Sequence, residues 1–196
     1  MSIVDGGAAA GLLERVRAIL LQPRTTWEIT EAEPTTIRAL YRGYVAPLAA
    51  IIPVILFLWT VVISPVFGLG TPLLLAGALI DLAVSYLIAL AGVGAFAWIA
   101  DRLASGFGAT RGLLPAFKVG AYGVTAVWVS GLCLLVPIFG PLGLVAGGVY
   151  SIQLIHLGLK QLMKPAADKA AAYTAVTILA TIGIVAAANA VLEALL

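Results

Sequence analysis

The stretch GTPLLLAGALIDLAVSYLIALAG (70–92) carries a single charged side chain, that of Asp81. It belongs to an apolar run over residues 72–100, which exceeds the roughly 20 residues that a helix needs to cross a membrane. Soluble domains have roughly a quarter of their residues charged. In this chain of 196 residues only 10% are charged and 62% are hydrophobic. The stretch therefore predicts a transmembrane helix, and the composition predicts a membrane environment for most of the chain.

Four further apolar segments flank this run, and each is long enough to cross a membrane. The sequence lacks the short alternating segments of a β-barrel, so all five spans are expected to be helices. The predicted fold is all-α, with an N-terminal cytoplasmic or interfacial segment (1–43) before a transmembrane domain (44–196). The predicted spans are 44–63, 72–100, 119–136, 142–159 and 171–192.

The basic residues predict the orientation of the spans. The connections before the second and fourth spans carry no Lys or Arg, and none follows the last span. All eleven basic residues therefore fall on one side, which the positive-inside rule makes cytoplasmic, with the C-terminus outside. They are Arg15, Arg17, Arg24, Arg38, Arg42, Arg102, Arg111, Lys118, Lys160, Lys164 and Lys169.

The segment AAAGLLERVRAILLQP (8–23) has the spacing of an amphipathic helix. Leu12, Val16, Ile19 and Leu20 fall on one face when the residues are placed on a helix. Two interpretations fit this pattern. The helix lies in the interface of the cytoplasmic leaflet, or it packs against the inner ends of the transmembrane bundle.

Asp81 is the candidate intramembrane site. A carboxylate at the bilayer centre costs about 3 kcal/mol on insertion scales, so it is expected to be paired, protonated or functional. If the membrane begins at the outer end of the second span, Asp81 lies about 12 Å deep. Its candidate partners at that depth are Tyr150, Thr125, Ser130 and, slightly further in, Gln153. A relay for protons or cations, a structural tie between helices and an interfacial placement all fit the sequence.

The sequence does not favour an enzyme. Ser130 lies near the predicted outer face and His156 near the inner one, which is too far apart for hydrogen-bonded catalysis. One Cys and one His nearly exclude a Cys/His metal site within one chain, and neither a metal nor a cofactor is expected. The net charge of +2 gives no indication of nucleic-acid binding.

Two residue patterns predict how the helices meet their surroundings. Aromatic residues near the predicted inner boundaries are expected to form a membrane-interface belt. They are Tyr41, Tyr44, Trp98, Phe117, Tyr122 and Tyr173. Small residues at four-residue spacing favour close helix approach, as in Gly143 with Gly147 and Gly183 with Ala187.

Three stretches resemble bacterial members of the Yip1-domain family. They are QPRTTWEI (22–29), EPTTIRALYRGYVAPLAAII (33–52) and FAWIADRLASGFGATRGLLPAFKVGAYG (96–123). The resemblance implies a five-helix integral membrane protein and transfers no catalytic residue. Eukaryotic relatives are linked to vesicle trafficking and to prenylated Rab-type GTPases through a longer N-terminal region with a DLYGP-type motif. This chain has neither feature, which favours a protein of the bacterial plasma (inner) membrane.

The resulting functional hypothesis is a non-enzymatic protein that acts through membrane organisation, or through protein or lipid partners, at its cytoplasmic face. The expected surface is basic and includes Arg102, Arg111, Lys118, Lys160, Lys164 and Lys169. The alternative hypothesis is a small channel or carrier for protons, cations or a small solute that uses Asp81. The sequence leaves the oligomeric state open.

Overall fold

The computed structural model describes residues 8–66, 74–136 and 138–195, and every element in these ranges is helical. Five helical segments in these ranges are long and apolar enough to cross a membrane, which confirms the predicted number of spans. They are Ile37–Val66, Leu75–Phe107, Leu113–Leu135, Gly140–Met163 and Ala170–Leu192.

The first span is interrupted rather than a single α-helix. It contains α3 (Ile37–Leu40), α4 (Ala46–Ala49), α5 (Ile51–Leu58) and α6 (Ser64–Val66), with π-helical turns at Tyr41–Val45 and Trp59–Ile63. It starts earlier than the predicted residue 44, because the Oγ1 of Thr36 accepts a hydrogen bond from the N–H of Ala39 at 3.2 Å and caps the first turn. Pro47 and Pro53 lack the N–H that an α-helix uses, and the α-helical pattern is interrupted close to both.

The other four spans are longer single helices or pairs of helices. The second is α7 (Leu74–Leu103), which continues into a 3-10 turn at Ala104–Phe107. The third joins α8 (Leu113–Gly123) and α9 (Thr125–Ser130), followed by a 3-10 turn at Gly131–Leu135. The fourth is α10 (Gly140–Gly158) with a π-helical turn at Leu159–Met163, and the fifth is α11 (Ala170–Leu195).

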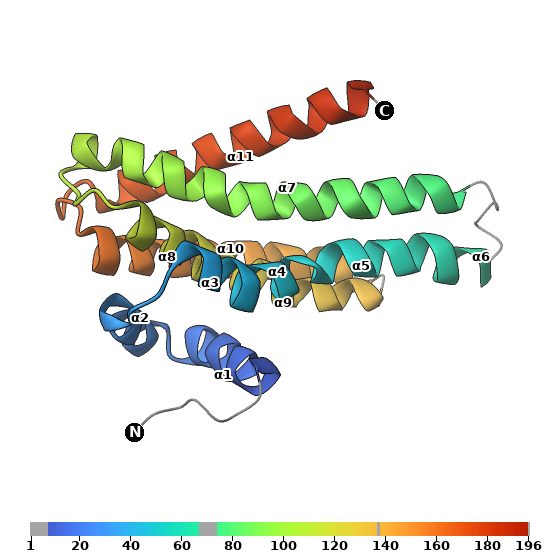
Figure 1. Cartoon of the computed structure of the whole chain (residues 1–196), viewed down its shortest axis with the longest axis horizontal. Helices are drawn as coiled ribbons and strands as arrows, with labels where there is room; N and C mark the ends of the chain where they lie inside the picture. Colours follow the sequence, from blue (N-terminus) through green and yellow to red (C-terminus); the bar gives the residue numbers. More distant parts are fainter. Residues whose placement is uncertain (1–7, 67–73, 137, 196) are drawn as a thin grey trace.

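The spans run along the long axis of the molecule (Figure 1). α7 contacts α5, α8 and α11, and α10 contacts α8 and α9. α11 lies close to α7 at its start and diverges from it toward the C-terminus (Figure 1). α5 and α6 extend further along the long axis than the connection from α9 to α10 does (Figure 1). The bundle is therefore more open at one end than at the other.

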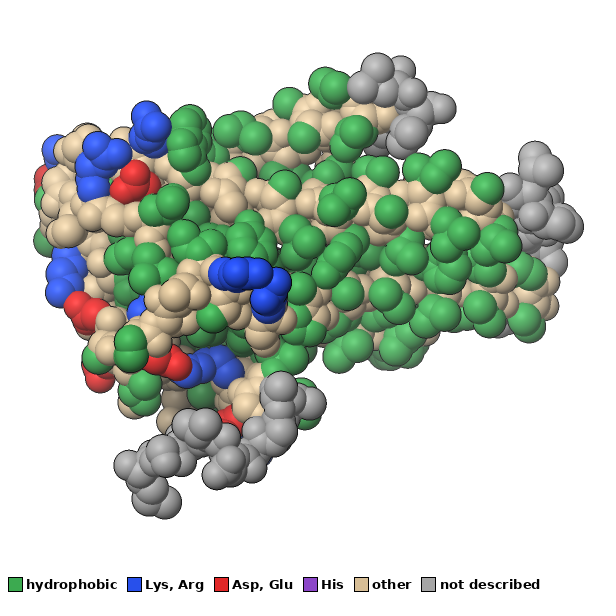
Figure 2. Space-filling model, viewed as in Figure 1, with side chains coloured by type: hydrophobic (Ala, Val, Ile, Leu, Met, Phe, Trp, Pro, Cys, Tyr) green, Lys and Arg blue, Asp and Glu red, His purple; other side chains and the backbone are tan. Residues whose placement is uncertain are grey.

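Charged side chains mark the opposite end. On the face shown in Figure 2, Lys and Arg side chains lie over the left half of the molecule, while hydrophobic side chains cover the right half. We call these the charged end and the apolar end. The connections from α7 to α8 and from α10 to α11 both lie at the charged end (Figure 1).

Two N-terminal helices lie beside the bundle toward the charged end (Figure 1). They are α1 (Ala8–Leu21) and α2 (Pro23–Ala32). Val16 and Ile19 of α1 are buried against the bundle, and the hydroxyl of Tyr150 on α10 donates to the Leu20 carbonyl at 2.7 Å. α1 thus packs on the bundle, the second of the two interpretations of its sequence.

The predicted aromatic belt is wrong for four residues. Tyr44, Phe117, Tyr122 and Tyr173 are buried in the core toward the charged end. The rings of Tyr44 and Tyr122 meet edge to face with centroids 4.6 Å apart. Trp98, in contrast, is 51% exposed. Aromatic rings here fill the space between helices instead of facing lipid headgroups.

Candidate functional site

The candidate site is the docked helix α2, which contacts α1, α10 and the turn at Leu159–Met163. Pro23 occupies its first turn, where the missing N–H has no cost. Thr26, Trp27 and Thr30 form its buried face. The Trp27 ring lies against Gly158 of α10, where an added Cβ would come within 2.7 Å of the ring atom Cζ2. The bare backbone of Gly158 thus provides the surface on which Trp27 packs.

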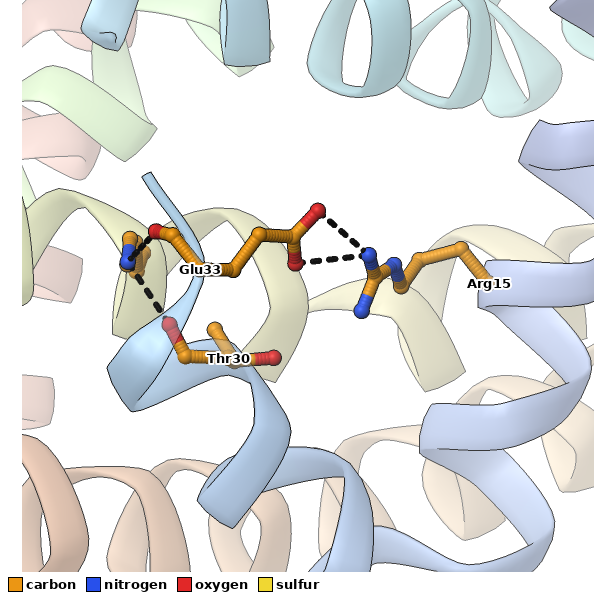
Figure 3. A network of polar contacts seen from close by, with 4 residues as sticks. Arg15, Thr30 and Glu33 are labelled. Carbon is orange, nitrogen blue, oxygen red and sulfur yellow. Dashed lines mark hydrogen bonds and ion pairs between the residues drawn. The ribbon is translucent and has the colours of Figure 1, made fainter. Parts of the chain in front are cut away.

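The C-terminal end of α2 is held by a buried lysine. Lys118 of α8 is only 6% exposed, and its Nζ donates to the carbonyls of Thr30 and Glu33, both at 2.7 Å (Figure 3). In a continuing helix the Thr30 carbonyl would accept from the residue four positions later, but that residue is Pro34, which has no N–H. Lys118 supplies the missing donor, and its positive charge also suits the negative end of the helix dipole.

An ion pair connects this end of α2 to α1. Nη2 of Arg15 lies 2.7 and 2.6 Å from the two carboxylate oxygens of Glu33 (Figure 3). The Arg15 guanidinium also lies 5.8 Å from the ring centroid of Tyr122 on α8. We call the group of Arg15, Thr30, Glu33 and Lys118 the latch, because it joins α1, α2 and α8.

Glu31 makes a second connection, from α2 to the end of the fourth span. Its carboxylate accepts a hydrogen bond from Nε2 of Gln161 at 2.6 Å and lies 2.6 Å from Nζ of Lys164. The contacts with Lys164 and then with Gln161 favour the charged form and lower the pKa of Glu31 below its usual value of 4.5. α2 is therefore attached to both α8 and the fourth span.

Lys118 corrects the predicted basic surface. The prediction placed it on the surface with five other basic residues, but it is buried and bonded to α2. The other five are exposed: Arg102, Arg111, Lys160, Lys164 and Lys169. Counting basic residues cannot distinguish a buried lysine from an exposed one. A lysine that caps a docked helix and a solvated lysine count equally in the positive-inside rule.

Besides Lys164, which pairs with Glu31, three of the exposed basic residues have partners. Arg102 lies over the ring of Trp98 at 5.2 Å from its centroid. Arg111 pairs with Asp101 at 3.1 Å, and the other oxygen of that carboxylate accepts from the N–H of Gly112 at 2.8 Å. Lys169 donates to the Gly106 carbonyl at 3.4 Å. These contacts order the loop between α7 and α8 and the one before α11.

The structure does not bring the candidate partners of Asp81 to its carboxylate. Tyr150 bonds to Leu20 as described above. The hydroxyls of Thr125 and Tyr44 share a hydrogen bond of 2.7 Å, and Ser130 donates to the carbonyl of Val127 at 2.9 Å. Gln153 and Asp81 are both exposed. Asp81 therefore lies on the exposed face of α7. The candidate partners were chosen because they have a similar predicted depth in the membrane, and depth alone did not predict which faces of the helices meet.

A polar group of different composition lies near Asp81. α7, α9 and α11 border a cavity of about 360 Å³, which we call the membrane crevice. Its polar lining residues are Ser85, Thr181 and Asn189. Asp81 lies one helical turn from Ser85, toward the N-terminus of α7 and on the same face of the helix. Tyr86 is not part of the crevice lining, and its hydroxyl donates to the Ala46 carbonyl at 3.2 Å.

The serine and histidine considered for catalysis have separate partners. Ser130 is bonded as described, and Nδ1 of His156 lies 2.9 Å from Oγ1 of Thr174 on α11. No group of three or more metal-ligating side chains occurs in the part of the chain that was placed.

Sequence reasoning missed the docking of α2 and therefore missed Trp27, Gly158 and Glu33. A signal was present in the sequence. Thr26, Trp27 and Thr30 have the spacing of a narrow buried face within an otherwise polar helix, and Pro34 leaves a carbonyl without a donor. Neither signal predicts which transmembrane helix packs against the buried face of α2.

Taken together, the five apolar helices and the helix pair packed on their charged end define a multi-pass α-helical membrane protein. The sequence model of the Yip1 domain matches residues 17–188, so the chain belongs to the Yip1-domain family. The match starts within α1 and includes Thr30, Glu33 and Lys118 of the latch, though not Arg15, as well as most of the transmembrane bundle. The searches of curated proteins and of solved structures found no match.

Proposed function

We propose that this Yip1-domain protein is a non-enzymatic protein of the bacterial inner membrane that binds a protein partner at its charged end. The observation that carries the proposal is a helix pair that is fixed to the bundle yet leaves large apolar side chains uncovered. Leu13, Leu21 and Ile29 are 68%, 67% and 57% exposed, respectively. Apolar side chains grouped among charged ones are typical of partner or membrane contact.

The proposal places the charged end in the cytoplasm, which the positive-inside rule supports. The single cysteine makes this testable. In a Cys133→Ser background, the Arg24→Cys variant should react with a membrane-impermeant maleimide in inverted vesicles and not in intact spheroplasts. Labelling from the outside of spheroplasts would overturn the orientation.

Partner binding is tested by site-specific photocrosslinking in cells. A photoreactive amino acid at Ile29 should give a discrete protein adduct, whereas one at Leu179, 67% exposed on α11, should give only lipid adducts. The Ile29 adduct should disappear in the Lys118→Met variant, because release of α2 displaces the surface. If Ile29 yields the same lipid adducts as Leu179, the proposal of a protein partner is wrong.

The membrane crevice favours one alternative function, a channel or carrier for protons, cations or a small solute. Ser85, Thr181 and Asn189 line it, and Asp81 lies one helical turn from Ser85. Proteoliposomes are expected to show a proton or potassium flux that the Asp81→Asn variant loses while keeping its thermal stability. Absence of flux in the wild-type protein would overturn this alternative.

A further inference from the structure

A second cavity lies between α2 and the end of the fourth span, away from the latch. Its volume is about 380 Å³. α2 contributes Arg24, Trp27 and Glu28 to its lining, and the fourth span contributes Leu157, Lys160 and Gln161. The latch holds the C-terminal end of α2, whereas this cavity lies along its N-terminal half.

Trp27 forms a buried wall of this cavity. The side chain is only 1% exposed, and no described residue accepts a hydrogen bond from its Nε1. Because that N–H is closed off from solvent, a ligand in the cavity cannot reach it, and the groups available to a ligand are the side chains of Arg24, Glu28, Lys160 and Gln161.

The charges at the cavity indicate the class of that ligand. Arg24 and Lys160 are exposed, and neither forms an ion pair with a described residue. The first turn of α2 adds N–H groups that no side chain of the preceding Gln22 caps. Glu28 reduces the net charge of the lining to +1. A phosphodiester with a single negative charge balances this lining, whereas a phosphate monoester with two negative charges does not.

The apolar surroundings indicate a lipid rather than a soluble phosphate ester. Val149, Gln153, Leu157 and Lys160 follow one face of α10 and its last turn at helical spacing. Val149 is 66% exposed, so the apolar span toward the middle of the molecule presents surface for acyl chains. Leu157 and Lys160 mark the point where this face changes from apolar to charged, which is where a headgroup would lie.

We infer that this cavity binds the headgroup of a monoanionic phospholipid, of the phosphatidylglycerol type. Arg24 and Lys160 contact the non-bridging phosphate oxygens. The Glu28 carboxylate limits the site to one negative charge. This deepens the proposed function by adding a lipid partner at the charged end, and it rests on that proposal only for the placement of this end at a leaflet surface.

The test is native mass spectrometry of delipidated protein in detergent micelles, titrated with phosphatidylglycerol, phosphatidylcholine or phosphatidic acid. Phosphatidylglycerol should bind most tightly. The Arg24→Gln and Lys160→Gln variants should each bind it about tenfold more weakly, because each loses a charge-assisted contact. Matched controls are Arg102→Gln and Lys169→Gln, which remove exposed charges outside the cavity and should leave binding unchanged.

Two further variants make the assignment specific. Trp27→Phe keeps a ring on Gly158 and removes only an N–H that is closed off from the cavity, so binding should be unchanged while the protein still melts cooperatively. Glu28→Gln raises the net charge of the lining to +2 and should strengthen binding of phosphatidic acid more than of phosphatidylglycerol. Equal loss of binding in the control variants, or full competition by soluble glycerophosphoglycerol, would overturn the inference. This assay contains no protein partner, so its failure is distinct from failure of the photocrosslinking test.

Discussion

The charged and apolar ends of the bundle are held together in different ways. Residues Ala116 to Gly123 of α8 are all buried toward the charged end. In α11, by contrast, only 6% of the apolar stretch is buried within the molecule. Polar contacts between helices also concentrate toward the charged end, where Lys118 caps α2 and the Tyr173 hydroxyl donates to the Ala100 carbonyl at 2.6 Å. The N-terminal helices lie beside the bundle toward its charged end and add contacts there (Figure 1).

At the apolar end, close helix approach joins the third and fourth spans, and Nε1 of Trp59 in the first span donates to the Leu134 carbonyl at 2.6 Å. A Cβ on Gly143 would come within 2.8 Å of the Cys133 sulfur, and one on Gly147 within 2.7 Å of the Ala126 carbonyl oxygen. This confirms the expected close approach for that pair of glycines. Gly183, from the other predicted pair, has nothing within 4 Å of an added Cβ. The comparison indicates that buried side chains and their hydrogen bonds predominate toward the charged end, whereas close backbone approach at Gly143 and Gly147 helps to join the third and fourth spans.

The largest expected effect comes from breaking the latch with Lys118→Met. The variant keeps an apolar stem but leaves the Thr30 and Glu33 carbonyls without their donor, so the free energy of unfolding should fall by about 3 kcal/mol. Hydrogen exchange should rise in α2 and stay unchanged in α11. Lys169→Met, with a single long contact, is the control and should change little. Unchanged exchange in α2 would mean that Lys118 does not hold it.

Gly158→Ala tests the other attachment of α2. Its Cβ would meet the rigid and buried ring of Trp27, and such overpacking should lower the free energy of unfolding by about 2 kcal/mol. Gly148→Ala on the same helix has open space, and Gly183→Ala tests the open face of α11. Both should be neutral or stabilising by up to about 1 kcal/mol, since Ala favours helices. Equal losses in all three variants would remove the contrast between the ends.

The five spans were predictable from sequence because the hydropathy and length of a segment indicate directly whether it can cross a membrane. The contacts between spans were not. A helix that is apolar all round gives no preferred face, so the depth of Asp81 predicted neither its exposure nor the actual partners of Tyr150 and Thr125. The predicted face of α1 was correct in its residues, because Val16 and Ile19 share a helix with charged neighbours. Lys118 was misplaced because its acceptors lie far from it in the sequence.

A smaller effect is expected from the ion pair between Arg15 and Glu33. The two side chains are 26% and 37% exposed, so solvent screens the pair and its coupling should be about 0.5–1 kcal/mol. A double-mutant cycle with Arg15→Ala and Glu33→Gln measures it. The pair of Arg111 and Asp101, with Arg111 56% exposed, is the comparison and should couple less. A coupling as large as the Lys118→Met effect would shift the main role in the latch from the lysine to the ion pair.

The smallest effect concerns Glu31 and appears only in acid. Lys164 and Gln161 lower the pKa of Glu31 below 4.5 in the folded protein, so the folded state binds this proton less readily than the unfolded chain. The resulting stabilisation is complete above about pH 4.5 and is lost as the pH falls through the lower folded-state value. The Glu31→Gln variant should therefore lose less stability than the wild type when acidified. Identical slopes for Glu31→Gln and the wild type would show that this contact does not contribute to the docking of α2, leaving Lys118 and Trp27 to hold it.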